Sequence, residues 1–365
     1  MARIVLEGVK KVFDRTVVAV DDVSLEIPDG EIVSLLGPSG CGKTTTMRLI
    51  AGFEDADEGR IFIDDKDVTT WPPQKRNLSM VFQFPVVYDT MTIYDNIAAP
   101  LHALKYRKEK IREVVEDAIA KFEIDSSLLR KKASNLSISD RQRVSLAHAF
   151  AIERNAYILD EPFSNIDPKS RVKLTKYVRD TQRKMGNTLI FVTHSQSEAL
   201  TLSDKIAVMK DGKILQYGSP EEIYSRPAST FVGWFLGNPG MNFIECSLAE
   251  KEGRLLLDAG SFTAHENLPP RYEGKLSGRE KVTLGIRPED VAISKEGKSH
   301  YIPCVCHFVE QVGSRLLLNV ELGKEVMINI KVPMDVDVDL GDRLYVYFPE
   351  EKIMLFDVAS GEALV

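Results

Sequence analysis

The octapeptide GPSGCGKT, residues 37–44, restricts the fold of this chain more than any other segment. It matches the phosphate-binding pattern G-x-x-x-x-G-K-[ST], with Gly37, Gly42, Lys43 and Thr44 in the fixed positions. The apolar run EIVSLL precedes the loop and the helix-forming run TTTMRLIAG follows it. In that setting the loop N–H groups and the positive end of the helix converge on one point. The segment therefore predicts a strand, loop and helix that bind nucleotide phosphates.

Individual residues of the loop have distinct expected roles. We expect Lys43 to bind the β- and γ-phosphates as a point charge and the Thr44 hydroxyl to ligate Mg²⁺. The alternative is a chance glycine turn, and the flanking strand and helix argue against it. The predicted nucleotide-binding residues of the loop are Gly37, Pro38, Ser39, Gly40, Cys41, Gly42, Lys43, Thr44 and Thr45.

Polar residues follow two apolar strand-like runs further along the chain. Asp160 and Glu161 come directly after residues 156–159, and His194 comes after residues 188–193. Because α/β sheets bind ligands at the carboxyl ends of their strands, these side chains are candidates for one site. We expect Asp160 to hold Mg²⁺, Glu161 to activate the attacking water, and His194 to contact the γ-phosphate or that water.

Gln83 ends the run LSMVFQ, and its amide is placed to join the metal and water shell. On the residues alone, a structural amide is an equal alternative for Gln83. The other candidate residues also have non-catalytic alternatives. Asp160 and Glu161 could be two acids that merely start a loop, and His194 could be a structural or exposed side chain.

The order of apolar runs predicts two domains, as the length of 365 residues also suggests. Up to about residue 237, strand-like and helical stretches alternate, which predicts a mostly parallel sheet covered by helices. An antiparallel β portion is expected before the first helix. From residue 238 onward, short strands between Gly, Asp and Pro turns predict a small β-barrel. Its expected strands include Lys281–Ile286, Arg315–Leu322, Glu325–Val332, Arg343–Phe348 and Lys352–Asp357.

The composition excludes several classes of protein. Hydrophobic residues at 44% and charged residues at 28% exclude collagen-like, low-complexity and mostly disordered chains. With 47 Lys and Arg against 54 Asp and Glu, the net charge of -7 predicts no general attraction to nucleic acid or to an anionic membrane.

The four cysteines are too few and too irregularly spaced for a disulfide scaffold, so we expect reduced, structural thiols at Cys41, Cys246, Cys304 and Cys306. The sequence has no basic segment leading into an apolar signal core. It also has no apolar run near the roughly 20 residues of a spanning helix. We therefore expect a cytoplasmic chain that reaches a membrane only through a partner.

In this order the motifs resemble those of the ATPase subunits of ABC transporters, and the resemblance covers nearly the whole chain. GPSGCGKT resembles the Walker A loop, Gln83 the Q-loop glutamine, and YILDEP the Walker B strand with Glu161 as catalytic base. His194 resembles the switch histidine, Asp167 belongs to a D-loop-like Asn-Ile-Asp, and Phe13 resembles the aromatic residue that stacks on adenine. The resemblance implies ATP and Mg²⁺ as cofactors.

The later segments FVGWFLGNPGMNFIE, LGIRPEDV, GDRLYVYF and IMLFD resemble importer ATPases of the carbohydrate-uptake type with a TOBE domain. This implies an α/β P-loop NTPase domain over residues 1–237, with a helical subdomain at about 88–155. An all-β, OB-like TOBE regulatory domain would follow over 238–365.

The same resemblance implies several partners and a location. Two ATPase subunits would lie beneath two integral membrane permease subunits on the cytoplasmic face of the cell membrane. An extracytoplasmic protein would bind the solute and deliver it. The groove for the coupling helix of the membrane subunit would follow the Q-loop, which makes Val86, Val87, Tyr88 and Met91 candidate contacts. Local packing of that loop is an equal alternative.

The signature segment departs from the family pattern, because the usual LSGGQ is here LSISD, residues 136–140. In the family this segment of one subunit closes over ATP held by the other, so Ser137 is a candidate phosphate contact. Ile138 and Ser139 replace two conformationally free glycines. Asp140 brings a like charge, with a repulsion of about 4 kcal/mol before screening at about 4 Å and an effective dielectric near 20. Asp140 is also a suitable N-cap, so we expect the following helix to persist.

Three hypotheses follow, and the first is favoured because every Walker-side catalytic residue is retained. In the first, the chain pairs with a non-identical ATPase that has an intact signature. The second is a homodimer with two slow sites, and the third is a regulatory subunit that does not hydrolyse ATP.

The solute is expected to be a sugar, polyol or glycerol phosphate, with polyamine, sulfate or iron as alternatives. Other classes that share the phosphate loop are a soluble ABC ATPase outside transport and a P-loop kinase. The chain has neither a second cassette nor a coiled-coil insertion, and a kinase would have no use for the signature-like helix.

Overall fold

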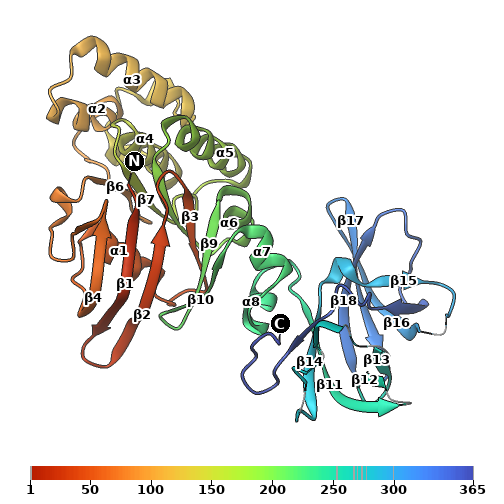
Figure 1. The fold of residues 1–365 in the computed structure, drawn as a ribbon. Coiled ribbons are helices and arrows are strands. Elements are labelled where there is room, and N and C mark those ends of the chain that lie inside the picture. The colour runs from red at the N-terminus through yellow and green to blue at the C-terminus, as the bar shows by residue number, and fades with distance from the viewer. Residues whose placement is uncertain are drawn as a thin grey trace. The chain divides into compact units, whose positions relative to one another are not determined.

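The computed structural model describes residues 2–251, 254–265, 268, 270–272, 274–276, 278–298 and 300–364. The chain divides into two units, Met1–Pro220 and Glu221–Val365 (Figure 1). The first unit thus ends earlier than the boundary near residue 237 that the composition predicts.

A six-stranded sheet forms the centre of the first unit, and the predicted α/β architecture is confirmed. All neighbouring pairs are parallel except the antiparallel pair at one edge. The three strands that carry the candidate site residues are almost wholly buried, as expected where helices cover both faces of a parallel sheet. In sheet order the strands are β10 (Lys213–Gly218), β9 (Lys205–Lys210), β3 (Ile32–Leu36), β8 (Thr188–Thr193), β7 (Ala156–Asp160) and β6 (Leu78–Val81).

A second sheet is antiparallel, as predicted for the early part of the chain. Two of its strands come before the first helix in the sequence and two come after it. Its strands are, in order, β2 (Val17–Ile27), β1 (Ile4–Phe13), β4 (Glu58–Ile63) and β5 (Lys66–Asp67). The pairing of β1 with β2 shifts register at several points.

The helices of this unit fall into two groups. One group packs beside the parallel strands: α1 (Lys43–Ala51) leads from β3 to the antiparallel strand β4, whereas α5 (Pro168–Met185) and α6 (Gln196–Leu202) connect successive strands of the parallel sheet. The other is a helical part made of α2 (Ile93–Ala103), α3 (Lys108–Lys121) and α4 (Ile138–Phe150). Short 3-10 turns lie at Pro73–Lys75, Ser126–Leu128, Ala133–Asn135, Pro270–Tyr272 and Pro288–Asp290.

The start of α4 corrects one prediction, because the N-cap is Ser137 and not Asp140. Ser137 has extended backbone angles, and its hydroxyl accepts the Asp140 N–H at 3.1 Å. Asp140 already lies in the first helical turn, and its carboxylate accepts the Ser137 hydroxyl at 2.6 Å. Ser137 therefore caps the helix, which persists as expected but begins two residues before Asp140.

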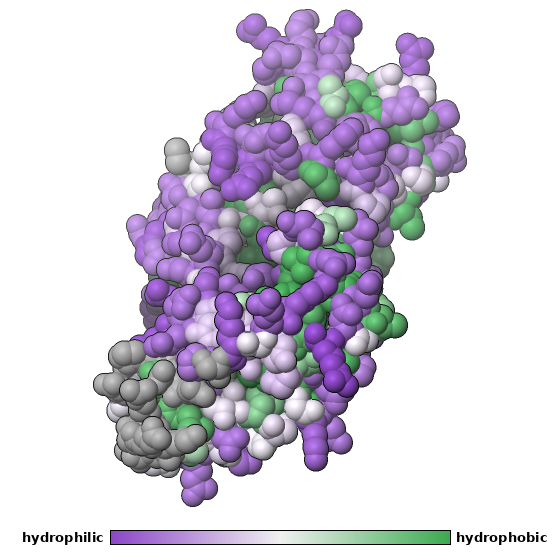
Figure 2. Space-filling model, turned by 90° about the vertical axis from the view of Figure 1, so that its right-hand side faces the viewer, coloured by the Kyte–Doolittle hydropathy of each residue, from purple (hydrophilic) through white to green (hydrophobic). Residues whose placement is uncertain are grey.

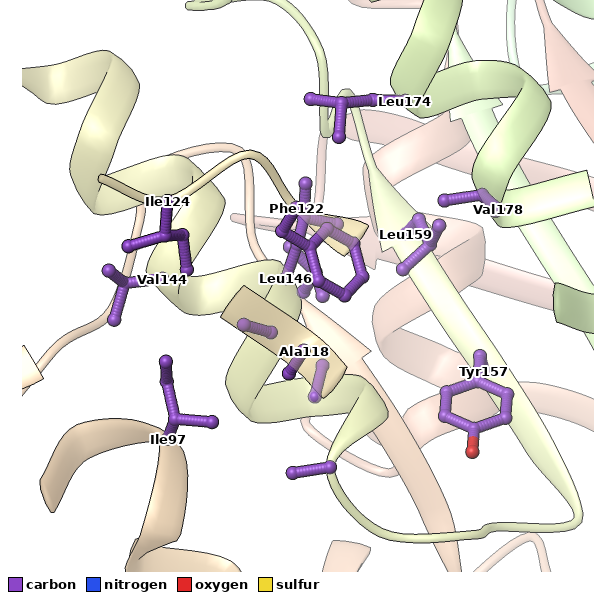
Figure 3. Close-up of a cluster of buried hydrophobic side chains, with 14 of the residues drawn as sticks. Ile97, Ala118, Phe122, Ile124, Val144, Leu146, Tyr157, Leu159, Leu174 and Val178 are labelled. Carbon is purple, nitrogen blue, oxygen red and sulfur yellow. The ribbon is translucent and has the colours of Figure 1, made fainter. Parts of the chain in front are cut away.

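Alternate residues of the buried strands contribute to two different cores, as the two-residue period of a strand requires. Ala156, Ile158 and Ile190 join the core shared with the antiparallel sheet and α1. Tyr157 and Leu159 join the core shared with the helical part, which includes Phe122 and Leu146 and is drawn in Figure 3. The sheet is therefore fixed between two apolar layers.

In its described residues the second unit contains two five-stranded antiparallel sheets around a main apolar core, in agreement with the predicted all-β domain. The helices α7 (Pro220–Ser225) and α8 (Thr230–Phe235) come before the sheets. The first sheet has the order β13 (Thr263–His265), β12 (Arg254–Asp258), β11 (Asn242–Lys251), β14 (Lys281–Ile286) and β20 (Met354–Phe356). The second has the order β15 (Ala292–Ser294), β19 (Arg343–Tyr347), β16 (Ile302–Val312), β17 (Arg315–Leu322) and β18 (Val326–Pro333).

The buried guanidinium of Arg287 explains why residues before 237 belong to the second unit. It is 3% exposed and donates to Gly233 O at 2.9 Å and to Tyr224 O at 2.7 Å. It also donates to Leu236 O and stacks on the Tyr224 ring. These bonds attach α7 and α8 to the chain just after β14.

The surface in the view of Figure 2 is mostly hydrophilic, and the four cysteines are buried as predicted for structural thiols. Hydrophilic side chains cover most of the face in Figure 2, and hydrophobic ones gather in smaller patches. In the part of the chain that the structure describes, no helix combines the length and hydrophobicity needed to span a bilayer. All four cysteines are free and buried.

Phe122 provides a test of the packing between the helical part and α5. Its side chain is fully buried, and its ring meets the Tyr177 ring edge to face at 4.9 Å. We expect Phe122→Ala to lower the free energy of unfolding by about 3–5 kcal/mol, because it removes a fully buried aromatic ring. Urea unfolding followed by helical circular dichroism measures this change. The control is Phe84→Ala at a side chain that is 78% exposed, and equal losses in the two variants would contradict the assignment.

Candidate functional site

The phosphate loop connects β3 to α1, and two of its glycines are required by their close contacts. A Cβ atom at Gly42 would lie 2.3 Å from Ala19 O, and one at Gly37 would lie 2.3 Å from Met209 O. Gly42 also has a φ of 104°, which side chains other than glycine rarely adopt. The loop is therefore pressed against the backbone of β2 and β9.

Lys43 is held within this loop by backbone carbonyls. Its ammonium donates to Gly37 O and to Pro38 O, each at 2.8 Å, and the residue is only 5% exposed. Cys41 Sγ lies 3.8 Å from the same ammonium. The positive charge is thus fixed at the loop, next to the N-terminus of α1, where an anion is favoured.

Thr44 and Asp160 face each other across the start of α1 and the end of β7. Thr44 Oγ1 donates to Asp160 Oδ1 at 3.4 Å, and Asp160 is 3% exposed. Burial, together with the nearby Glu161 charge, raises the pKa of the Asp160 carboxyl to about 6. A hydroxyl and a carboxylate are ligands that suit Mg²⁺. Over the described residues no three His, Cys, Asp or Glu side chains cluster as a metal site, so water and phosphate oxygens would complete the shell.

Glu161 is the residue at which the separate predicted segments meet. Its Oε2 lies 3.1 Å from His194 Nδ1 and accepts a hydrogen bond from Gln83 Nε2 at 3.3 Å. The Glu161 side chain is 16% exposed, and the residue has a φ of 42°. Gln83 follows β6, Glu161 follows β7 and His194 follows β8. The strand ends therefore bring a carboxylate, an amide and an imidazole together.

An open cleft of about 310 Å³ is lined by half of the predicted residues. Its lining consists of Ala19, Ser39, Gly40, Gly42, Lys43, Thr44, Thr45, Gln83 and Glu161. Ala19 is the member that sequence reasoning missed. It approaches the loop through its backbone carbonyl, and no side-chain pattern signals such a contact.

Eight predicted residues are not part of this lining. Gly37, Pro38 and Cys41 belong to the phosphate loop, Asp160 ends β7, and His194 lines a neighbouring cavity together with Glu161. The other three are Phe13, Ser137 and Asp167. Phe13 is half-buried at the end of β1, with Lys11 Nζ 5.4 Å from its ring centroid. Ser137 caps α4, and Asp167 caps α5 by accepting the Ser170 N–H at 2.9 Å. Asp167 also pairs with Arg143 at 3.4 Å.

The segment after Gln83 is exposed and apolar. Val86 is 63% exposed, Tyr88 is 53% exposed and Met91 is 40% exposed. Val87 instead packs, partly buried, against the core of the helical part.

These features define a P-loop nucleotide hydrolase. The loop would bind the phosphates, Thr44 and Asp160 suit a hard cation, and the Glu161 carboxylate lies beside the phosphate position. The family model described as ABC transporter matches residues 20–164. Models described as MalK OB fold domain and TOBE domain match residues 237–291 and 284–356.

Three relatives match over nearly their whole length. The chain is 40% identical to the trehalose/maltose import ATP-binding protein MalK of Thermococcus litoralis, over 100% of both chains. It is 36% identical to the oligosaccharides import ATP-binding protein MsmX of Bacillus subtilis, over 98% of both. It is 37% identical to the sn-glycerol-3-phosphate import ATP-binding protein UgpC 3 of Agrobacterium fabrum, over 99% of both.

Among solved structures, a dimeric ATP-binding cassette bound to ADP and phosphate superposes with a TM-score of 0.55 at 27% identity, covering 60% of this chain and 98% of that one. The chain therefore belongs to the ABC transporter family of ATP-binding proteins. It is an ATP hydrolase whose reaction is coupled to transport.

The pKa of Asp160 gives a pH dependence that can be measured on the metal-free protein. Between about pH 4 and 6 the folded chain holds the Asp160 proton and the unfolded chain releases it, so stability falls as the pH rises through this window. Asp160→Asn removes this loss. We expect the variant to gain about 3 kcal/mol relative to wild type between pH 4 and pH 7.

Urea unfolding in the presence of EDTA at several pH values measures this difference. Glu113→Gln, at a side chain of α3 that is 69% exposed, serves as the control for loss of a surface charge. A difference between Asp160→Asn and wild type that does not change with pH would contradict the assignment.

Proposed function

We propose that the cleft beside the phosphate loop hydrolyses MgATP to energise import of a small solute. The main support is the arrangement around Glu161, because Gln83 and His194 both contact one of its oxygens. Glu161 also lines the same cleft as Lys43 and Thr44. Glu161 is the base, and Lys43 holds the β- and γ-phosphates. The residues that contact the nucleotide are Phe13, Gly37, Pro38, Ser39, Gly40, Cys41, Gly42, Lys43, Thr44 and Thr45, with Ser137 and Asp167 acting toward the partner's site.

The chemistry follows from the charges around Glu161. Gln83 and His194 share Oε2, which leaves Oε1 to accept a proton from the attacking water. Thr44 and Asp160 would hold Mg²⁺, with Gln83 at the edge of its shell, and the ion would neutralise phosphate charge. Lys43 needs little movement, because two carbonyls already hold its ammonium beside the loop.

Glu161→Gln tests the base in the assembled transporter. The amide keeps the shape of the side chain but cannot accept the proton, so we expect ATP turnover to fall by about 100-fold or more, with nucleotide affinity changed less than about threefold. Turnover of radiolabelled ATP and nucleotide titration measure the two quantities. The matched control is Glu153→Gln at an exposed position before β7. Unchanged transport by Glu161→Gln would show that another group is the base.

A sugar, polyol or glycerol phosphate is the proposed solute, because the relatives named above import trehalose, maltose, oligosaccharides or sn-glycerol-3-phosphate. The proposed assembly has two integral membrane permease subunits, an extracytoplasmic solute-binding protein and two ATPases at the cytoplasmic face. The exposed side chains of Val86, Tyr88 and Met91 supply an apolar surface for the permease. Copurification with membrane subunits separates this role from a soluble ABC ATPase.

The second ATPase is proposed to be a different chain with an intact LSGGQ signature. In the segment LSISD the Ser137 hydroxyl donates to Asp140 at 2.6 Å, so it is engaged by a carboxylate. Ile138 at the start of α4 is 61% exposed. A phosphate approaching this end of the helix would meet a branched side chain and a negative charge, which weakens the site that this segment would complete.

The purified chain alone should therefore turn over ATP slowly. Addition of an ATPase subunit with an intact LSGGQ signature should raise the rate by about tenfold or more, given the repulsion of about 4 kcal/mol before screening. A steady-state phosphate-release assay measures both rates. Brisk turnover by the chain alone would favour a homodimer.

A gain-of-function variant gives a second test of this prediction, with an exposed surface variant as its control. Ile138→Gly, Ser139→Gly and Asp140→Gln together restore LSGGQ and should raise turnover of the chain alone. Arg112→Gln, at a side chain of α3 that is 75% exposed, should leave it unchanged.

A further inference from the structure

Glu198 lies between two parts of the candidate site, although it does not line the phosphate cleft. It is in the first turn of α6, and its side chain is 10% exposed. Its Oε2 accepts a hydrogen bond from Thr193 Oγ1 at 2.7 Å, and its Oε1 lies 3.8 Å from Arg171 Nε. Buried ion pairs add little net stability to a fold. Stabilisation alone therefore does not explain the buried Glu198 carboxylate, and its two neighbours indicate another role.

The first neighbour, Thr193, fixes the backbone on both sides of His194. Thr193 is the last residue of β8, and its hydroxyl donates its proton to Glu198. The same oxygen accepts the Ser195 N–H at 2.9 Å, and Ser195 Oγ accepts the Glu198 N–H at 3.4 Å. His194 is thus enclosed in a hydrogen-bonded turn that depends on Glu198. Its own side chain is 57% exposed, so surrounding packing does little to hold it.

The second neighbour, Arg171, reaches the loop that follows Glu161. Arg171 Nη2 donates to Ile166 O at 3.1 Å. In the same loop, Ser164 Oγ donates to Glu161 O at 3.0 Å. Arg171 Nε is buried and makes no hydrogen bond, and its ion-pair partner is Glu198. The carboxylate of Glu198 therefore orients a guanidinium that in turn holds the Glu161 loop.

A small cavity of about 70 Å³ lies among these groups. Its lining includes Glu161, His194, Arg171 and Glu198. Glu198 thus borders the same space as the two residues assigned to the reaction. Burial raises the pKa of the Glu198 carboxyl, and the Thr193 hydrogen bond and the Arg171 charge oppose that shift.

We propose that Glu198 is a positioning residue for ATP hydrolysis. Through Thr193 it fixes the strand end that carries His194, and through Arg171 it fixes the loop that follows Glu161. It thereby keeps the imidazole and the carboxylate at the separation that the reaction needs. This inference rests on the roles of Glu161 and His194 proposed above.

Glu198→Ala in the assembled transporter is the first test. We expect kcat to fall by about tenfold or more, because small displacements of reacting groups have large effects on rate. The KM for ATP should change by less than about threefold, since the phosphate-loop contacts are unaltered. Glu109→Ala, an exposed acid in the first turn of α3, is the matched control and should behave as wild type.

Thr193 gives a second test that leaves Glu198 in place. Thr193→Val keeps the shape but removes the hydroxyl, so kcat should fall, whereas Thr193→Ser keeps the hydroxyl and should restore it. Equal rates in the two Thr193 variants, or an undiminished kcat in folded Glu198→Ala, would overturn the proposal. A parallel loss of nucleotide binding and kcat would also overturn it.

Glu161→Gln separates this inference from the proposed function. If Glu161→Gln still hydrolyses ATP, the assignment of the base fails. If Glu161→Gln is inactive while Glu198→Ala and Thr193→Val retain full kcat, only the positioning role fails.

Discussion

The parallel register of three central strands is the constraint on which the candidate site depends. Asp160 at the end of β7 lies opposite Val192 of β8, and the Glu161 N–H donates to Val192 O at 2.9 Å. Leu36 at the end of β3 lies opposite Thr193. Because these strands run in one direction and end at the same level, the phosphate loop, the acids and the histidine lie at one edge of the sheet. A slip of one residue would turn each strand's side chains to the opposite core.

Most of the fold was predictable because its elements are local in sequence. The expected strands Lys281–Ile286 and Arg315–Leu322 agree with β14 and β17 to the residue. The expected Lys352–Asp357 is longer than β20 (Met354–Phe356), since apolar composition does not reveal where ladder hydrogen bonds stop. The phosphate loop and the acids after β7 were likewise predictable, because each is one contiguous segment whose chemistry depends on neighbouring residues.

Contacts between distant backbone groups could not be predicted in the same way. Ala19 reaches the phosphate loop through its carbonyl, and the register that brings it there is set by the pairing of β2. Ser137 and Asp140 are both suitable N-cap residues for α4, and only the extended backbone angles of Ser137 identify it as the N-cap. Glu198 is one acid among many in the sequence, and its importance depends on burial and on the meeting of three elements.

The bonds made by Arg287 determine where this chain can be cut without losing contacts within the second unit. A chain cut at residue 237 would separate this guanidinium from the carbonyls of Tyr224, Gly233 and Leu236 and from the Tyr224 ring, so these contacts would be lost. A cut near Pro220 keeps donor and acceptors in one piece. The part of the chain that keeps these contacts therefore starts with α7, ahead of the first β-strand of the unit, and includes both helices.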